Sequence, residues 1–145
     1  MIFSKACEYG VRAATYVAQK SLNNERCSMK DISKEIDSPE AFTAKILQKL
    51  VKAGIIKSVK GATGGFEVNL KDMKRVKLAD IVIAIDGELY DKVCVLGLKK
   101  CSEAHPCPVH YKFKHIKNDV LSMIHNTSLA DMSSSVDAGF SCLKI

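Results

Sequence analysis

The sequence predicts a mainly α-helical protein: a winged helix-turn-helix with a small β-hairpin wing, followed by a long C-terminal dimerisation helix. Two amphipathic helical patterns flank the break Asp37-Ser38-Pro39, and two strand-like runs joined through glycines follow them. Residues 94–110 then gather three cysteines and a histidine among loop-forming residues, before a heptad-like apolar repeat. We expect residues 1–75 to form the winged domain, 76–132 the cysteine loop and dimerisation helices, and 133–145 a loosely ordered tail.

The composition permits an independent core and favours an acidic partner. Of the 145 residues, 47% are apolar, which suffices for a core without disulfide bonds, so the six cysteines are available for other chemistry. The net charge of +6 favours a polyanion such as nucleic acid, although a solvated lysine-rich surface would give the same total. Whether the partner is nucleic acid therefore depends on where the charges lie in the chain.

We expect neither a signal peptide nor a membrane-spanning helix in this sequence. Glu8 and Arg12 interrupt the apolar residues that an N-terminal signal peptide would need. No apolar run approaches the roughly 18 residues of a spanning helix, because Asp80 and Asp86 cut the longest candidate. We expect a cytoplasmic protein with reduced thiols and no membrane partner.

The first helix is expected over residues 4–21, where apolar and small residues recur at steps of three and four. Glu8 and Arg12 lie on one face of it, which a surface ion pair would explain. Asn23 and Asn24 should end this helix. The recurring residues are Ala6, Tyr9, Ala13, Tyr16 and Val17.

A second, short helix should begin at Ser28. The segment Ser28-Met-Lys-Asp31 has the form of a capping box in which an aspartate replaces the usual Glu or Gln. Met29, Ile32 and Ile36 would form the buried stripe of this helix.

The third helix is expected from Pro39 to Ala53, with Ser38 as its cap and Gly54 as its end. One face is apolar and the other is small, polar and basic, as in a recognition helix that enters the major groove. A helical hairpin with an ordinary solvated face is the alternative. The apolar face holds Phe42, Ile46, Leu47 and Leu50, and the expected DNA contacts are Ser38, Pro39, Glu40, Ala41, Phe42, Thr43, Lys45 and Lys49.

Two strand-like runs, residues 55–59 and 66–70, favour a winged helix over a helical hairpin. The glycine-rich link between them is too open for a two-residue turn. We expect Lys57, Lys60 and Gly61 on this wing to contact phosphate or the minor groove. A nucleotide-binding loop is disfavoured, because the link lacks a Gly-Lys-Ser/Thr ending and does not precede a helix.

The C-terminal half contains two further predicted helices. Residues 78–87 form a compact apolar pattern that ends at Gly87, and Pro108 should open a long helix. Apolar residues on the long helix step by four and three, which indicates a homodimer, although part of this seam could pack on its own domain. A short turn of helix is expected at residues 129–132. The seam holds Val109, Phe113, Ile116, Val120, Met123 and Thr127.

The cysteine loop has the spacing Cys94-x6-Cys101-x5-Cys107-x2-His110. Structural zinc usually uses C-x2-4-C knuckles, and this loop has none. The wider spacing suits an iron–sulfur cluster, 2Fe–2S or 4Fe–4S, in which the ligands bind separate irons, with His110 as the fourth ligand. Flanking lysines would favour thiolates and offset the charge of a cluster; they are Lys92, Lys99 and Lys100.

Three other interpretations of the loop stay open. Zinc or a thiol-redox switch could use the same cysteines, in an adaptor whose winged domain binds protein; a steep loss of DNA binding with salt would exclude such an adaptor. Cys107 and His110 could also be a catalytic pair, but no orienting acid or oxyanion motif accompanies them. We therefore do not expect an enzyme.

Several motifs together are specific for one family. With these motifs the chain resembles the Rrf2 family of bacterial winged-helix regulators, which includes the iron–sulfur cluster regulator and the nitric-oxide-sensing repressor. The resemblance implies a repressor that dimerises by crossing at the long helix, binds a pseudo-palindromic double-stranded operator, and holds a sensory cluster near its DNA-binding domains. The motifs are Tyr9-Gly-Val-Arg-Ala, Lys49-Leu-Val-Lys-Ala-Gly-Ile-Ile, Ser58-Val-Lys-Gly-Ala-Thr-Gly-Gly-Phe, Ala79-Asp-Ile-Val and Thr127-Ser-Leu-Ala-Asp, with three cysteines before the long helix.

Within this family the fourth cluster ligand differs by subgroup. The Cys107-x2-His110 spacing resembles that of the iron–sulfur regulator, whereas Glu8 falls where nitric-oxide sensors supply an acid from the other subunit. Two features depart from the family: the first cysteine interval is six residues instead of the five common with histidine, and Lys60 replaces the usual arginine of the wing. Cys7, Cys27 and Cys142 match no family ligand.

Overall fold

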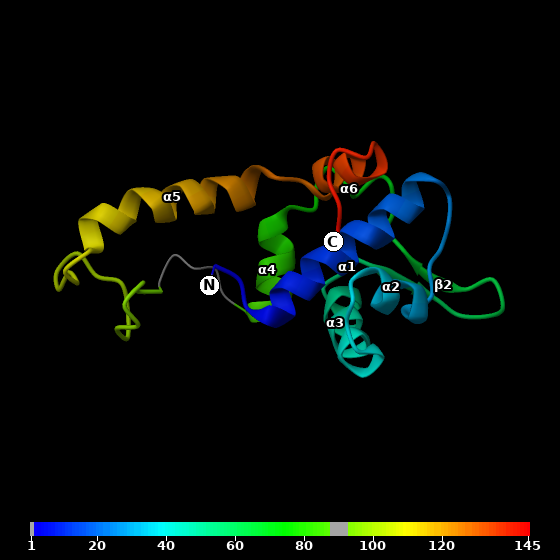
Figure 1. The fold of residues 1–145 in the computed structure, drawn as a ribbon, viewed down its shortest axis with the longest axis horizontal. Helices are drawn as coiled ribbons and strands as arrows, with labels where there is room; N and C mark the ends of the chain where they lie inside the picture. Colours follow the sequence, from blue (N-terminus) through cyan, green and yellow to red (C-terminus); the bar gives the residue numbers. More distant parts are fainter. Residues whose placement is uncertain (1, 88–92) are drawn as a thin grey trace.

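The computed structural model describes residues 2–87 and 93–145, which fold into a helical body with one projecting helix (Figure 1). None of the helices described is long and apolar enough to cross a membrane. Along the chain the elements are α1 (Lys5–Leu22), α2 (Met29–Glu35), α3 (Glu40–Lys52), β1 (Lys57–Val59), β2 (Gly65–Glu67), α4 (Leu78–Asp86), α5 (His110–Asn126) and α6 (Leu129–Asp137). Figure 1 shows α5 extending away from the other elements, with the cysteine loop at its far end.

Helix α1 runs through the centre of the body and packs against α3, α4 and α6. Ser4 caps its start, where its side chain accepts a hydrogen bond from the Cys7 amide, and Asn23 caps its end as expected. Gly10 lets α4 come close, because a Cβ at this position would lie 2.9 Å from Ile85 Cγ1.

Helices α2 and α3 form the expected helix-turn-helix. Ser28 and Asp31 exchange the two hydrogen bonds of a capping box at the start of α2. The predicted cap of α3 is wrong: Pro39 takes the cap position, and α3 begins one residue later than expected. The Ser38 amide donates to the Ser33 carbonyl, and no side chain makes a capping hydrogen bond at the start of α3.

The wing is shorter than the sequence suggested. Strands β1 and β2 pair antiparallel over three residues each, with Lys57 opposite Glu67. Residues 55–56 are buried in the core instead of extending the strand. Cys27 forms an isolated bridge with Phe66, so the loop between α1 and α2 adds a third backbone partner to the hairpin.

Two helix ends in the C-terminal half differ from the prediction: the start of α5 and the end of α6. Helix α4 ends as predicted at Gly87, which has a φ of 83°, but α5 begins at His110 rather than at Pro108. Helix α6 continues to Asp137, where we expected a loosely ordered tail. It packs against α1, and the hydroxyl of the buried Ser133 donates to a carbonyl of its own helix, so polar residues here line a packed face.

Candidate nucleic-acid interface and cysteine pocket

The first turns of α3 present most of the expected DNA contacts to solvent. Pro39, Glu40, Ala41 and Lys45 are exposed. Phe42 is half-buried, and its ring meets the edge of the Tyr9 ring with a centroid distance of 5.6 Å. The exposed surface at the start of α3 is therefore small and polar, as a helix that enters a DNA groove requires.

Three expected contacts have other roles in this structure. Thr43 is fully buried, and its hydroxyl donates to the Pro39 carbonyl at 3.0 Å. The ammonium group of Lys49 donates to the Ile85 carbonyl at the end of α4, at 2.9 Å. The Ser38 Oγ atom is buried and has no hydrogen-bond partner among the described residues. The surface available to a partner on α3 is accordingly narrower than the sequence suggested.

The wing presents its basic residues outward. Lys57, Lys60 and Gly61 are all exposed. Gly61 lies in the tip of the wing and has a φ of 105°, a conformation that favours glycine. Lysines on such a tip can neutralise phosphates, which gives binding that weakens with salt.

The cysteine loop and α5 line a cavity of about 230 Å³, which we call the cysteine pocket. All four side chains expected from the sequence line it: Cys94, Cys101, Cys107 and His110. His110 is the first residue of α5, and its amide donates to the Cys107 carbonyl at 3.0 Å. The local turn thus brings the last cysteine and the histidine to the same wall of the cavity.

His110 is the least satisfied polar group in the pocket. Its side chain is 7% exposed, and Cys101 Sγ lies 3.5 Å from Nδ1. The other ring nitrogen, Nε2, is buried and has no hydrogen-bond partner in the part of the chain described here. A buried ring nitrogen without a partner is costly, so this arrangement suits a ligand that the chain does not supply.

The Cys94 sulfur accepts several hydrogen bonds. Donation from the Leu96 and Leu98 amides holds the pKa of the Cys94 thiol below its ordinary value, and a hydrogen bond from Cys107 and the charge of Lys117 act in the same direction. Amide-to-sulfur hydrogen bonds and a nearby cation favour the thiolate, which is the form that binds metal.

Two lysines of α5, Lys114 and Lys117, also line the cavity, which was not expected from the sequence. Lys114 pairs with Glu103, which raises the pKa of Lys114 and lowers the pKa of Glu103. Lys117 donates to the Val93 carbonyl at 3.3 Å. The two lysines could have been predicted, because His110, Lys114 and Lys117 are spaced by four and three residues and so lie on one face of a helix. Lys99 and Lys100 are exposed, and Lys92 lies outside the described residues.

The donors surround the cavity without converging on one point. Within residues 2–87 and 93–145, no group of three or more His, Cys, Asp or Glu side chains is close enough together to hold a single metal ion. Glu8 does not line the cavity; its Oε2 lies 3.1 Å from Lys5 Nζ in the first turn of α1. The chemistry of the donor set, three thiols and an imidazole around a common space, fits a group larger than one ion.

The sequence matches one family along most of its length. The profile of the Rrf2 family, described as an iron-dependent transcriptional regulator, matches residues 3–135. A relative from Aquifex aeolicus, named as an HTH-type transcriptional regulator, is 35% identical over 136 residues, which cover 91% of this chain and 91% of the relative. The HTH-type transcriptional regulator IscR of Vibrio cholerae is 25% identical over 124 residues, covering 86% and 70% of the two chains.

Solved structures share the fold. The global cysteine regulator CymR of B. subtilis superposes with a TM-score of 0.75 at 23% identity, covering 92% of this chain and 97% of the other. IscR of T. potens gives a TM-score of 0.71 at 22% identity, covering 98% and 93%. The mainly helical architecture with a small hairpin wing is thereby confirmed.

Proposed function

Because the chain belongs to the Rrf2 family of transcriptional regulators, we propose that it is a cytoplasmic, homodimeric repressor whose affinity for DNA depends on an iron–sulfur cluster. Its relatives are transcriptional regulators, not enzymes. One observation carries the proposal beyond the family: Cys94, Cys101, Cys107 and His110 line one cavity, and the buried Nε2 of His110 has no partner among the described residues.

The cysteine pocket would hold the cluster through the three thiolates and a ring nitrogen of His110. When bound, the cluster supplies iron that reacts with small signals such as nitric oxide or oxygen. The chain's own part is to favour the thiolate of Cys94: backbone amides donate to its sulfur, and Lys117 places a cation beside it.

Glu8 is the alternative fourth ligand, supplied by the second subunit. It lies on α1, outside the cavity of its own chain, so in this alternative it would reach the pocket of the other subunit. The variants His110→Ala and Glu8→Gln separate the two ligand sets. The variant that removes the fourth ligand should change the visible spectrum of the reconstituted cluster, and the other variant should not.

We propose that DNA contacts the exposed start of α3 and the tip of the wing. Lys45, Lys57 and Lys60 would neutralise phosphates, and the small residues at the start of α3 would approach the base edges. A pseudo-palindromic operator would match two such surfaces in a dimer. The proposed contacts are Pro39, Glu40, Ala41, Phe42, Lys45, Lys57, Lys60 and Gly61.

The uncovered seam of α5 supports the homodimer. Ile116 is 55% exposed and Met123 is 44% exposed, although both belong to the predicted heptad seam. The fully buried residue of α5 is Ile124, where the helix meets the body. A second copy of α5 would cover the seam with matching residues, as in other helical dimers.

The cysteine pocket and the dimer helix are linked at His110. This residue faces the cavity and is also the first residue of α5. Gain or loss of the cluster is therefore proposed to shift the start of α5, and through the dimer seam to change the separation of the two α3 helices. A change in that separation alters the fit to an operator of fixed half-site spacing.

The experiment is anaerobic purification followed by an absorption spectrum and assays of iron, acid-labile sulfide and zinc per chain. Broad visible absorbance with matching iron and sulfide supports the proposal. Cys101→Ala should lose the cluster and keep its thermal unfolding transition, whereas Cys142→Ala, which changes an exposed cysteine outside the pocket, should load normally. Absence of iron even after anaerobic reconstitution would contradict the cluster.

A thiol-redox switch is the second candidate, because Cys107 already donates a hydrogen bond to Cys94. In that case peroxide would join the two sulfurs as a disulfide and change DNA affinity in metal-free protein. Peptide mapping after oxidation checks this directly. A Cys94–Cys107 link that alters DNA binding without iron would favour the thiol switch over the cluster.

A further inference from the structure

The wing has little sheet of its own to hold its tip in place. Its strands contribute three residues each, and an isolated two-stranded hairpin is at best marginally stable. Its tip, residues 60–64, nevertheless carries Lys60 and Gly61, two of the proposed DNA contacts. A contact from outside the hairpin must therefore help to position the tip.

The loop between α1 and α2 provides backbone support at the base of the wing. The Cys27 amide donates to the Phe66 carbonyl at 3.2 Å, and the Phe66 amide donates to the Cys27 carbonyl at 2.9 Å. Gly65 permits this approach, because its φ is 138° and a Cβ there would lie 2.9 Å from the Cys27 oxygen. This support reaches β2 but not the tip.

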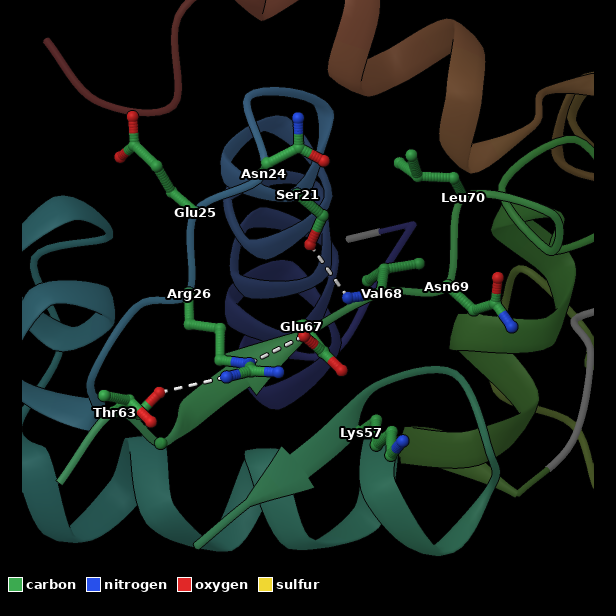
Figure 2. Close-up of a pocket in the computed structure, with 11 residues that line it drawn as sticks. Ser21, Asn24, Glu25, Arg26, Lys57, Thr63, Glu67, Val68, Asn69 and Leu70 are labelled. Atoms are coloured by element: carbon green, nitrogen blue, oxygen red, sulfur yellow. Dashed lines mark hydrogen bonds and ion pairs between the residues drawn. The ribbon is translucent and has the colours of Figure 1, made fainter. Parts of the chain in front are cut away.

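Arg26, the residue before Cys27, reaches both parts of the wing. Its Nε donates to Glu67 Oε2 at 2.7 Å, and its Nη1 donates to the Thr63 carbonyl at 3.0 Å. Figure 2 shows the Arg26 guanidinium between these two partners, one on β2 and one in the tip loop. The two bonds fix the tip relative to the strand and to the end of α1.

We propose that Arg26 positions the wing tip for DNA, and that its contact with Glu67 is required for full affinity. This inference rests on the proposed role of the wing in DNA binding. The pair is partly exposed, at 38% for Arg26 and 27% for Glu67, and exposed ion pairs contribute little to global stability. Loss of the pair should therefore loosen the tip without unfolding the protein.

Glu67→Ala gives the sharpest test. An effect of charge alone and the loss of wing-tip positioning by Arg26 predict opposite changes in DNA affinity for this variant. The substitution removes a negative charge, so charge alone predicts tighter DNA binding. Positioning predicts binding weaker by about threefold to tenfold. Glu25→Ala is the matched control. Glu25 and Glu67 both line a surface pocket beside Arg26 (Figure 2), but Glu25 pairs with Lys20 at 3.6 Å, outside the wing, and its loss changes the charge equally.

The probe is a double-stranded oligonucleotide selected by the wild-type protein from a random-sequence pool. Arg26→Ala should weaken binding, and Lys60→Ala should cost less affinity in the Arg26→Ala background than in wild type, because the tip is already displaced. Additive losses, or an affinity of Glu67→Ala equal to that of Glu25→Ala, would overturn the proposal.

Amide hydrogen exchange tests positioning without DNA. Residues 60–64 should exchange faster in Arg26→Ala and Glu67→Ala than in wild type or Glu25→Ala, while exchange in α3 stays unchanged. Unchanged exchange at the tip would refute the role of Arg26. Failure of the wild-type protein to select any duplex would instead contradict the proposed function, and the exchange result would still decide about Arg26.

Discussion

Lys45 and Lys49 lie one turn apart on α3, yet their charged groups have different surroundings. Lys45 is exposed at the proposed DNA surface. Lys49 Nζ donates to the Ile85 carbonyl, which belongs to the last turn of α4 and has no partner within its own helix. Lys49 therefore acts as a side-chain cap of α4, a role that favours a cation through the helix dipole.

The two lysines should respond differently to removal of the charge. Lys45→Met should reduce the slope of log affinity against log salt by about one phosphate contact. Lys49→Met should leave that slope close to wild type and lower the free energy of unfolding by about 0.5–1.5 kcal/mol. DNA titrations at several salt concentrations and urea unfolding measure both effects. An equal loss of slope in the two variants would mean that Lys49 also contacts phosphate.

For single residues, the sequence predicted which cysteines and histidine come together, but it did not predict which side chains are buried. The cysteine spacing predicted four residues that the fold brings to one cavity. Thr43 was expected among the DNA contacts, but its hydroxyl bonds within α3 and the side chain is buried. Arg26 and Glu67 are separated by 41 positions, so no local pattern could pair them.

Helix ends that carry a local capping signal were predicted more accurately than the other helix ends and the strand lengths. The capping box of α2 and the glycine end of α4 depend on local hydrogen bonds, which the sequence encodes within a few residues. The wing depends on Cys27, far away in sequence, and residues 55–56 are buried in the core. Helix α6 was underestimated because its packing against α1 is a tertiary effect. The division at residues 75 and 132 stays a prediction.

The capping box of α6 makes its stability depend on pH. Hydrogen bonds from the Ser128 hydroxyl and amide lower the pKa of Asp131 below its ordinary value. A carboxylate with a lowered pKa stabilises the fold above its unfolded pKa of about 4, and this contribution is lost as the pH falls through the lowered folded value. Asp131→Asn should therefore lower stability at neutral pH but not in acid.

Urea unfolding of Asp131→Asn between neutral pH and about pH 3 checks this expectation. The exposed Asp119 on α5 supplies the control variant Asp119→Asn, which should parallel wild type throughout. A constant difference between Asp131→Asn and wild type at all pH values would show that the Asp131 charge does not stabilise α6.

In the whole molecule, α5 projects from the body as an arm (Figure 1). The body covers the C-terminal half of α5, where Val120, Leu121 and Ile124 pack against the core. Exposed apolar side chains continue from α5 into the cysteine loop, where Val93, Val95, Leu96 and Leu98 are each about half exposed. Apolar patches of this kind mark interaction surfaces. The arm therefore supports the proposed homodimer and places the cysteine pocket where a second subunit could contact it.

Ile116→Glu should convert the proposed dimer to a monomer, because a buried charge in a helical seam is unpaired. Ile83→Glu is the control, since Ile83 is a 44% exposed isoleucine on α4, outside the seam. Light scattering after size exclusion gives the mass of each variant in solution. A wild-type monomer, or dissociation by both variants, would contradict the assignment of the interface to α5.

The central claim is that the cysteine pocket controls DNA binding. The most direct measurement is the ratio of DNA dissociation constants for the same anaerobic preparation with its cluster and after chelation, using a duplex selected by the wild-type protein. We expect the ratio to differ from one by about tenfold or more, and to be close to one for Cys101→Ala. A ratio of one in wild-type protein that carries stoichiometric iron and sulfide would contradict the claim.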